Sequence, residues 1–139
     1  MKIGTIEAVY VDSSAIVAII LDEPDAAALL KRLMAAPSPF TSIVTKVEAS
    51  LALTRIGGKA GPAAQMVAEF LDRLDIRVVA VEPTMFEHVM QAAARYGRRS
   101  GHRARLNFGD CFSYAFAKQA KVPLLYKGND FAQTDLSGG

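Results

Sequence analysis

The sequence lacks the features that would place it outside a reducing compartment or in a membrane. It has one cysteine, Cys111, in 139 residues, so no disulfide can form within the chain, and we expect a cytoplasmic protein. No apolar run reaches the roughly 18 residues that a membrane-spanning helix needs, which excludes a membrane partner. Residues 1–7 hold a lysine and an early acid and make a poor signal peptide. There is also no internal repeat or low-complexity linker.

The sequence also lacks an excess of charge of either sign. Sixteen Lys and Arg residues face fourteen Asp and Glu residues, for a net charge of +2, which excludes a broadly cationic nucleic-acid binder. Hydrophobic residues make up 51% and charged residues 22%, as in a globular protein with a packed core. The length predicts a single domain over residues 1–139, with a frayed tail from about residue 136.

Short apolar, β-branched runs alternate with amphipathic segments along the chain. Strands are predicted at residues 8–11, 40–44, 76–81 and 123–126, and helices at 15–21, 25–35, 45–56, 61–74, 83–96 and 108–120. We expect Ser13 and Ser14 to cap the first helix. This alternation predicts an α/β fold with a parallel sheet covered by helices on both faces. In such sheets ligands bind beyond the carboxyl ends of the strands.

Four acids are candidates for that edge, and each also has an ordinary structural explanation. Asp12 follows the first strand, where it could be a helix cap. Glu48 shares an apparent apolar face with Val44, Val47 and Leu51, so it should point inward. A buried carboxylate needs compensation by a basic residue or a cation, unless Glu48 lies at the margin of the helix.

The other two acids lie in the second half of the chain. Asp110 falls in the first turn of a helix that Asn107 could cap, as in a capping box. Asp130 follows the last strand in a turn-forming sequence. Four carboxylates at one sheet edge would repel one another unless a divalent cation neutralised them, and oxygen ligands suit Mg²⁺ or Mn²⁺. The pattern therefore indicates metal-dependent phosphodiester hydrolysis.

The order of these motifs resembles the PIN-domain family, and more narrowly the VapC-type toxin ribonucleases of toxin–antitoxin pairs. The matching segments span nearly the whole chain: residues 11–15 (VDSSA), the helix carrying Glu48, residues 106–112 (LNFGDCF) and residues 123–131 (PLLYKGNDF), with Thr134-Asp135-Leu136. The NFGDC stretch followed by KGNDF is the most specific part.

The resemblance implies a three-layer α/β/α sandwich with a central parallel sheet and an acidic pocket for Mg²⁺ or Mn²⁺. It implies an endoribonuclease in which metal-activated water hydrolyses RNA to a 5′-phosphate and a 3′-hydroxyl. The implied catalytic acids are Asp12, Glu48, Asp110 and Asp130. Asp12 and Asp110 would bind the metal, and Glu48 and Asp130 would act on it directly or through water. Ser14, Asn107 and Asn129 would support these acids. Some relatives carry the fourth acid where this sequence has Gly128, so either Asp130 or Asn129 completes the site.

Basic and apolar segments indicate the partners. Arg98, Arg99, Arg103 and Arg105 crowd the segment before Asp110, where they could contact an RNA backbone, although such a loop can also be merely solvated or bind an acidic protein. Any apolar stripe left exposed on the helices of residues 15–35 would suit an amphipathic helix of a VapB-type antitoxin. A homodimer is implied by the resemblance alone.

Two other functions remain open at this point. Asp12 with Lys127 is superficially similar to a phosphoryl-accepting α/β domain, although a phosphatase-like pattern wants an acid where Ser14 stands. A PIN-like module that binds a partner without catalysis is the second alternative. Cys111 has no second cysteine or nearby histidine to support nucleophilic chemistry, so a packed thiol is expected.

Overall fold

The computed structural model describes residues 8–136. The segment judged a poor signal peptide and residues 137–139 of the expected tail lie outside the described residues. Leu136, where the tail was expected to begin, instead packs against the core, and its N–H donates to Thr134 Oγ1 at 3.1 Å. Among the described residues no helix is long and apolar enough to cross a membrane.

The centre of the fold is a parallel sheet of four short strands. These are β1 (Ala8–Val11), β2 (Ser38–Ser42), β3 (Arg77–Val79) and β4 (Leu124–Leu125), in the order β3-β2-β1-β4. The predicted parallel sheet is confirmed, with shifted strand ends. Pro39, just before the strand predicted at residues 40–44, lies inside β2. It pairs with Val9 before β2 begins pairing with β3 at Phe40, so no ladder bond to β3 is lost there.

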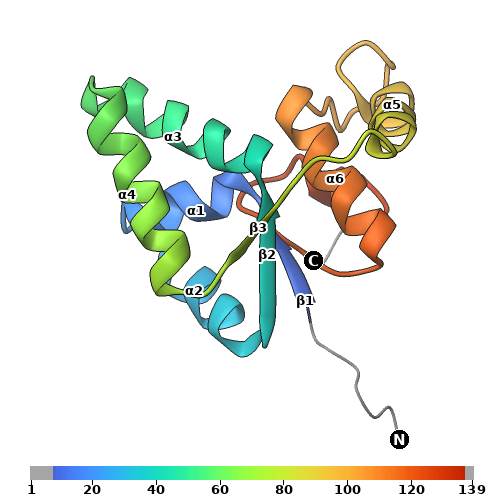
Figure 1. Ribbon diagram of the computed structural model, residues 1–139. Coiled ribbons are helices and arrows are strands. Elements are labelled where there is room, and N and C mark those ends of the chain that lie inside the picture. Colours follow the sequence, from blue (N-terminus) through green and yellow to red (C-terminus); the bar gives the residue numbers. More distant parts are fainter. Residues whose placement is uncertain (1–7, 137–139) are drawn as a thin grey trace, which may run out of the picture.

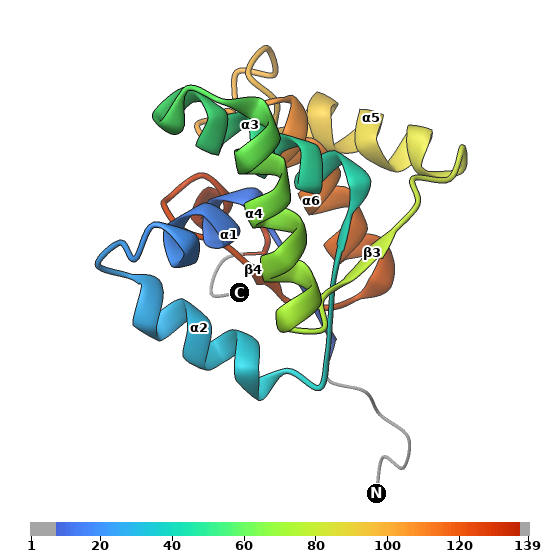
Figure 2. The same ribbon diagram turned by 60° about the vertical axis from the view of Figure 1, so that its left-hand side comes forward.

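Helices cover both faces of the sheet and make three layers (Figures 1 and 2). One face carries α1 (Ser13–Ile20), α2 (Ala26–Ala35), α3 (Ile43–Gly57) and α4 (Ala60–Arg73); the other carries α5 (Met85–Tyr96) and α6 (Phe108–Ala120). A 3₁₀ turn, η1 (Phe131–Gln133), follows β4. Alternate strand residues separate the two cores: Val9 and Val11 pack with the first group of helices, and Tyr10 packs with the second.

The C-terminal segment is tied to α6 through Asp135. Tyr114 Oη donates to Asp135 Oδ1 at 2.6 Å, and Lys118 Nζ donates to Oδ2 at 2.9 Å. Burial raises the pKa of Asp135, but these two hydrogen bonds and the charges of Lys118 and Arg95 outweigh it and leave the pKa below its ordinary value. The ionised form is therefore favoured in the folded state.

We expect Asp135→Asn to lower the unfolding free energy at neutral pH by about 1–2 kcal/mol, because hydrogen bonds to an ionised acceptor are lost. Since the folded pKa is depressed, this stabilisation is present above the ordinary pKa and disappears as the pH falls through the folded value. Urea unfolding at neutral and acidic pH measures both effects. Asp72→Asn, on the exposed side of α4, is the control. Equal losses for Asp135→Asn at both pH values would contradict the assignment.

Candidate active site

Three of the predicted acids meet beyond the carboxyl ends of the strands. Asp12 directly follows β1, Glu48 lies in the second turn of α3, and Asp110 is the third residue of α6. The amino-terminal ends of α3 and α6 stand on either side of this edge (Figure 1). Asp12 is 1% exposed and Asp110 is 7% exposed, whereas Glu48 is half-buried.

Asp12 is held by three donors. Its Oδ2 accepts from Ser14 N at 3.0 Å and from Ser14 Oγ at 2.7 Å, and its Oδ1 accepts from Ser113 Oγ at 2.6 Å. The structural explanation of Asp12 as a helix cap is therefore confirmed, because Asp12 is the N-cap of α1, and the interpretation of Ser13 and Ser14 as the caps is wrong. Ser14 does support the carboxylate as predicted, and its own Oγ accepts from Lys127 N at 2.9 Å. Because both Asp12 oxygens are bonded from the protein side, the side chain is fixed before any ligand arrives.

Ser113 was missed in the sequence, and it connects Asp12 to a buried chain of hydroxyl groups. Its Oγ lies 3.5 Å from Thr45 Oγ1, which lies 2.8 Å from Tyr10 Oη, and Tyr10 Oη donates to Ser42 at 2.9 Å. Ser113 comes three residues after Asp110, so the two share one face of α6. That spacing, in a segment otherwise made largely of aromatic residues and alanine, is the signal that could have identified it.

Glu48 lies at the margin of α3, not on its buried face. The buried residues of this helix are Thr45, Ala49 and Leu53, while Val47 and Leu51 are 50% and 53% exposed. The expectation that Glu48 shares an inward apolar face with Val47 and Leu51 is wrong, because apolar spacing alone does not say which face packs.

The Glu48 carboxylate is held by a hydroxyl group. Ser13 was considered only as a helix cap, and its Oγ instead donates to Glu48 Oε1 at 2.8 Å. No basic side chain of the described residues forms an ion pair with Glu48. Burial raises the pKa of Glu48 more than the Ser13 hydrogen bond lowers it; the charge of Asp12 raises it further, and the more distant charge of Arg55 lowers it without forming an ion pair. The salt-bridge explanation of Glu48 therefore has no support here.

Asp110 forms the predicted capping box with Asn107. Asn107 Oδ1 accepts from Asp110 N at 2.8 Å, and Asp110 Oδ2 accepts from Asn107 N at 3.1 Å. Burial, then the charge of Asp12, raises the pKa of Asp110 to about 7; the Asn107 hydrogen bond opposes this, and the charges of Asp130 and Glu48 add to it. The other three predicted acids are thus close enough for their charges to raise the pKa of Asp110.

Asp130 is the least constrained of the four. It is the N-cap residue of η1, it is exposed, and its side chain makes no capping hydrogen bond. Asn129 and Gly128 beside it are also exposed, and Gly128 adopts a φ of +100°. The structure places this loop close enough for the charge of Asp130 to act on Asp110, without a contact that distinguishes Asp130 from Asn129.

The donors at this edge fit a hard divalent cation. All are carboxylate or hydroxyl oxygens, and no Lys or Arg of residues 8–136 pairs with Asp12, Glu48 or Asp110. Within those same residues no group of three or more His, Cys, Asp or Glu side chains lies close enough together to hold a metal ion. Mg²⁺ is commonly held by one or two carboxylates and keeps several waters, so an open arrangement suits it.

Lys127, which the phosphoryl-accepting alternative would pair with Asp12, forms its ion pair with Glu23 instead. Lys127 Nζ donates to Glu23 Oε1 at 2.6 Å, in the turn between α1 and α2. Cys111 is buried, and burial raises the pKa of its thiol to about 11. The prediction of a packed, unreactive thiol agrees with this placement.

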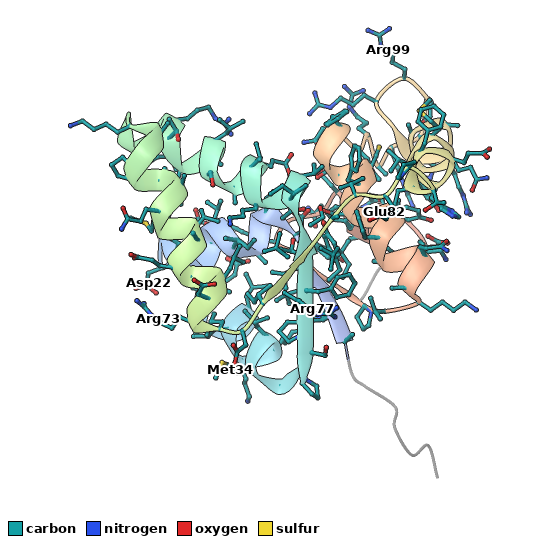
Figure 3. All side chains as sticks on the ribbon, in the orientation of Figure 1. Asp22, Met34, Arg73, Arg77, Glu82 and Arg99 are labelled. Carbon is teal, nitrogen blue, oxygen red and sulfur yellow. The ribbon has the colours of Figure 1, made fainter. Side chains whose placement is uncertain are left out.

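The basic segment is a loop with an ordered base and exposed arginines. Leu106 N donates to Tyr96 O at 2.8 Å and closes the loop between α5 and α6. The four predicted RNA-contacting residues are exposed: Arg98, Arg99, Arg103 and Arg105. Figure 3 shows Arg99 near the top of the molecule, extended into solvent.

Comparison with known proteins agrees with this fold. The sequence model of the PIN domain matches residues 9–136. The chain belongs to the PIN-domain family. Its PIN relatives include a VapC ribonuclease of Rhizobium meliloti, 42% identical, over 91% of this chain and 98% of the relative. A ribonuclease VapC of Mycolicibacterium smegmatis is 38% identical, over 91% and 96% of the two chains.

A solved structure shares the PIN fold. It is the VapC20 toxin of Mycobacterium tuberculosis, described as cleaving the sarcin-ricin loop. The TM-score is 0.69 at 22% sequence identity, with 89% of this chain and 92% of that chain covered. The likeness confirms the three-layer α/β/α architecture, with its central parallel sheet, for this PIN domain.

Proposed function

We propose that this protein is a Mg²⁺- or Mn²⁺-dependent endoribonuclease and the toxin of a toxin–antitoxin pair. One observation carries the proposal: the carboxylates of Asp12 and Asp110 are both buried, and the charge of Asp12 raises the pKa of Asp110. Neither carboxylate forms an ion pair with a basic side chain of the described residues. Two ionised acids in such a place need a cation to offset their repulsion and desolvation. Relatives named VapC ribonuclease support the choice of RNA as substrate.

Each side chain has a role in this proposal. Asp12 and Asp110 would hold the cation, with Glu48 and Asp130 acting on it directly or through water. The cation, when bound, neutralises charge on the scissile phosphodiester and activates the attacking water. Glu48, whose pKa is raised, would accept the proton of that water. The expected products carry a 5′-phosphate and a 3′-hydroxyl.

The supporting residues keep these acids in place. Ser14 and Ser113 fix the orientation of Asp12, and Asn107 does the same for Asp110. Asn129 is the alternative to Asp130 as the polar group that completes the site. The same geometry with no metal affinity would instead describe the non-catalytic binding module.

We propose that the loop between α5 and α6, which carries Arg98, Arg99, Arg103 and Arg105 and is called the arginine loop below, guides the RNA backbone to the site. Reversing the charge of Arg98 and Arg99 together should weaken single-stranded RNA binding at low salt by at least tenfold. It should also make the salt dependence of binding shallower, by about 0.7 in log–log slope for each phosphate that the loop no longer neutralises. Fluorescence anisotropy in a chelator, at a series of salt concentrations, measures both.

Arg32→Glu with Arg73→Glu is the matched control, because these two exposed arginines lie on α2 and α4. Equal losses of affinity from the two double variants would mean that net charge, and not the loop, determines binding. An unchanged slope in the loop variant would also reject the proposed role of the loop.

Exposed apolar side chains offer surfaces for the proposed protein partners. A groove of about 420 Å³ between α5 and α6 is bordered by Phe86, Met90 and Phe108, which are 69%, 52% and 76% exposed. On α2, Leu29 and Leu33 are buried and Met34 is 67% exposed, so the predicted stripe on the first two helices is mostly core. We propose that a VapB-type antitoxin and a second copy of the chain cover exposed apolar surface of this kind. Light scattering with and without the antitoxin tests this.

The decisive test of function is to induce the protein in cells without its antitoxin and to sequence the RNA 5′-phosphate ends that appear. We expect the protein to act in the cytoplasm. New ends that are absent when Asp12→Asn is induced support the proposal. Calorimetry with Mn²⁺ separates the alternatives, because a non-catalytic module should bind no metal. A phosphorylated protein formed with acetyl phosphate would favour the phosphoryl-accepting domain.

A further inference from the structure

We infer that Gly109 is a positioning residue for Glu48, and that the missing side chain at position 109 is what admits the Glu48 carboxylate to the site; this rests on the proposed function. Gly109 is the second residue of α6, directly before Asp110, and it is buried. A Cβ atom built on Gly109 would overlap both carboxylate oxygens of Glu48 and their carbon, Cδ. The carboxylate therefore occupies the space that any other residue at this position would fill.

The contact between Gly109 and Glu48 joins α6 to α3, which are far apart in the sequence. Glu48 arrives from α3 and is held on its other side by Ser13 Oγ at 2.8 Å. Gly109 brings the first turn of α6, and with it Asp110, against the same carboxylate. The carboxylate lies between α1 and α6, so a side chain at position 109 must displace either Glu48 or the helix turn that carries Asp110.

The side chain of Glu48 is the part that would move. The atoms in the way are the far end of a flexible side chain, which can rotate at low cost, while the α6 turn is fixed by the Asn107 capping box. Alanine is also the more favourable residue in a helix. Gly109→Ala should therefore retain the fold and move the Glu48 carboxylate away from Ser13 and Asp110.

The backbone does not require glycine at this position. The glycines with positive φ in the described residues are Gly58, Gly101 and Gly128, and Gly109 lies within a regular helix. Gly61 is the matched control, since it is likewise the second residue of a helix, α4, and nothing lies within 4 Å of a Cβ built on it.

The test compares Gly109→Ala and Gly61→Ala by Mn²⁺ calorimetry without RNA, by thermal unfolding, and by RNA cleavage. Gly109→Ala should weaken Mn²⁺ binding and slow cleavage by about 10- to 100-fold each, the range for residues that orient metal ligands. Its melting temperature without metal should not fall, and Gly61→Ala should match the wild type in metal binding and cleavage. A crystal structure of Gly109→Ala should show the bond between Ser13 and Glu48 broken.

A double variant separates the steric cause from general damage. Glu48→Asp withdraws the carboxylate by about 1.5 Å, the length of one carbon–carbon bond. In that background Gly109→Ala should cost little further metal affinity or activity, because the overlap is gone. Additive losses would show that alanine distorts Asp110 instead, and would overturn the inference.

Other results of these measurements would count against the inference or against the proposed function. Full Mn²⁺ affinity and activity in Gly109→Ala, or a protein that unfolds, would overturn the inference and leave the proposed function standing. A wild-type protein that neither binds Mn²⁺ nor cleaves RNA would reject the proposed function, and the inference with it.

Discussion

Replacing Asp12 by asparagine is expected to abolish metal-dependent RNA cleavage while the protein remains folded. The carboxylate is 1% exposed and lies at the centre of the acidic edge. Losing its charge removes a metal ligand that would contribute several kcal/mol to stabilising the transition state, so cleavage should fall at least about a thousandfold.

The fold should survive because asparagine can make the same hydrogen bonds. Its amide oxygen can accept from Ser14 N and Oγ, as Asp12 Oδ2 does, and asparagine is as good an N-cap as aspartate. Its amide nitrogen can donate to Ser113 Oγ, since a hydroxyl group can reverse its role. One negative charge is also removed from beside Asp110, so the metal-free variant should be at least as stable as the wild type.

Cleavage of a single-stranded RNA in Mg²⁺, together with thermal unfolding, measures both effects. Asp22→Asn is the control: Asp22 is exposed, lies beyond the opposite end of α1 from Asp12 and is seen at the left of Figure 3, and its φ of +53° is one that asparagine tolerates. Substantial activity in Asp12→Asn would remove Asp12 from the catalytic site. Loss of activity with loss of folding would assign it only a structural role.

The second large effect is the linkage between metal, pH and stability at Asp110. The pKa of this residue is raised from 3.8 to about 7 in the folded protein, so the folded state holds a proton that the unfolded state releases. Metal-free stability should therefore fall as the pH rises between about 4 and 7, by at most about 1.4 kcal/mol per pH unit. Above that window the ionised carboxylate destabilises the fold in full.

Adding Mg²⁺ or Mn²⁺ at alkaline pH should reverse this loss. A cation at a hundred times its dissociation constant stabilises the folded state by about 2.7 kcal/mol, which raises the melting temperature by several degrees. Asp110→Asn should remove most of the pH slope and most of the metal effect, and the raised pKa of Glu48 should account for the slope that remains. Thermal unfolding in chelator and in metal, across pH, measures this. A wild-type melting temperature unmoved by metal at alkaline pH would reject the proposed cation site.

Much of the fold follows from local patterns. The four strands, the six helices and the capping box of Asn107 and Asp110 were predictable because each depends on residues near one another in the chain. The parallel sheet followed from the alternation of these elements, and its carboxyl edge indicated where to look for Asp12 and Asp110.

Glu48 shows where local patterns fail. The spacing of Val47, Glu48 and Leu51 predicted one buried face, but α3 packs through Thr45, Ala49 and Leu53. Both faces carry apolar residues at helical spacing, so the choice between them depends on what α1, α4 and α6 present to α3. Ser113 was missed, and Ser13 was assigned the wrong role, for the same reason: the role of a serine depends on the carboxylate that the fold brings beside it.

Residue order and composition were enough to predict the class of the fold and the acidic character of its sheet edge, and the near balance of sixteen basic against fourteen acidic residues excluded a broadly cationic surface. Helix periodicity, capping and strand composition are local properties, so they can be recognised one segment at a time. The folded structure was needed to show that Ser113, 101 positions away, donates to Asp12, and that Glu48 occupies the space left open by Gly109. Those interactions join segments that the chain separates, and only the packing of α1, α3 and α6 beyond β1 brings them together.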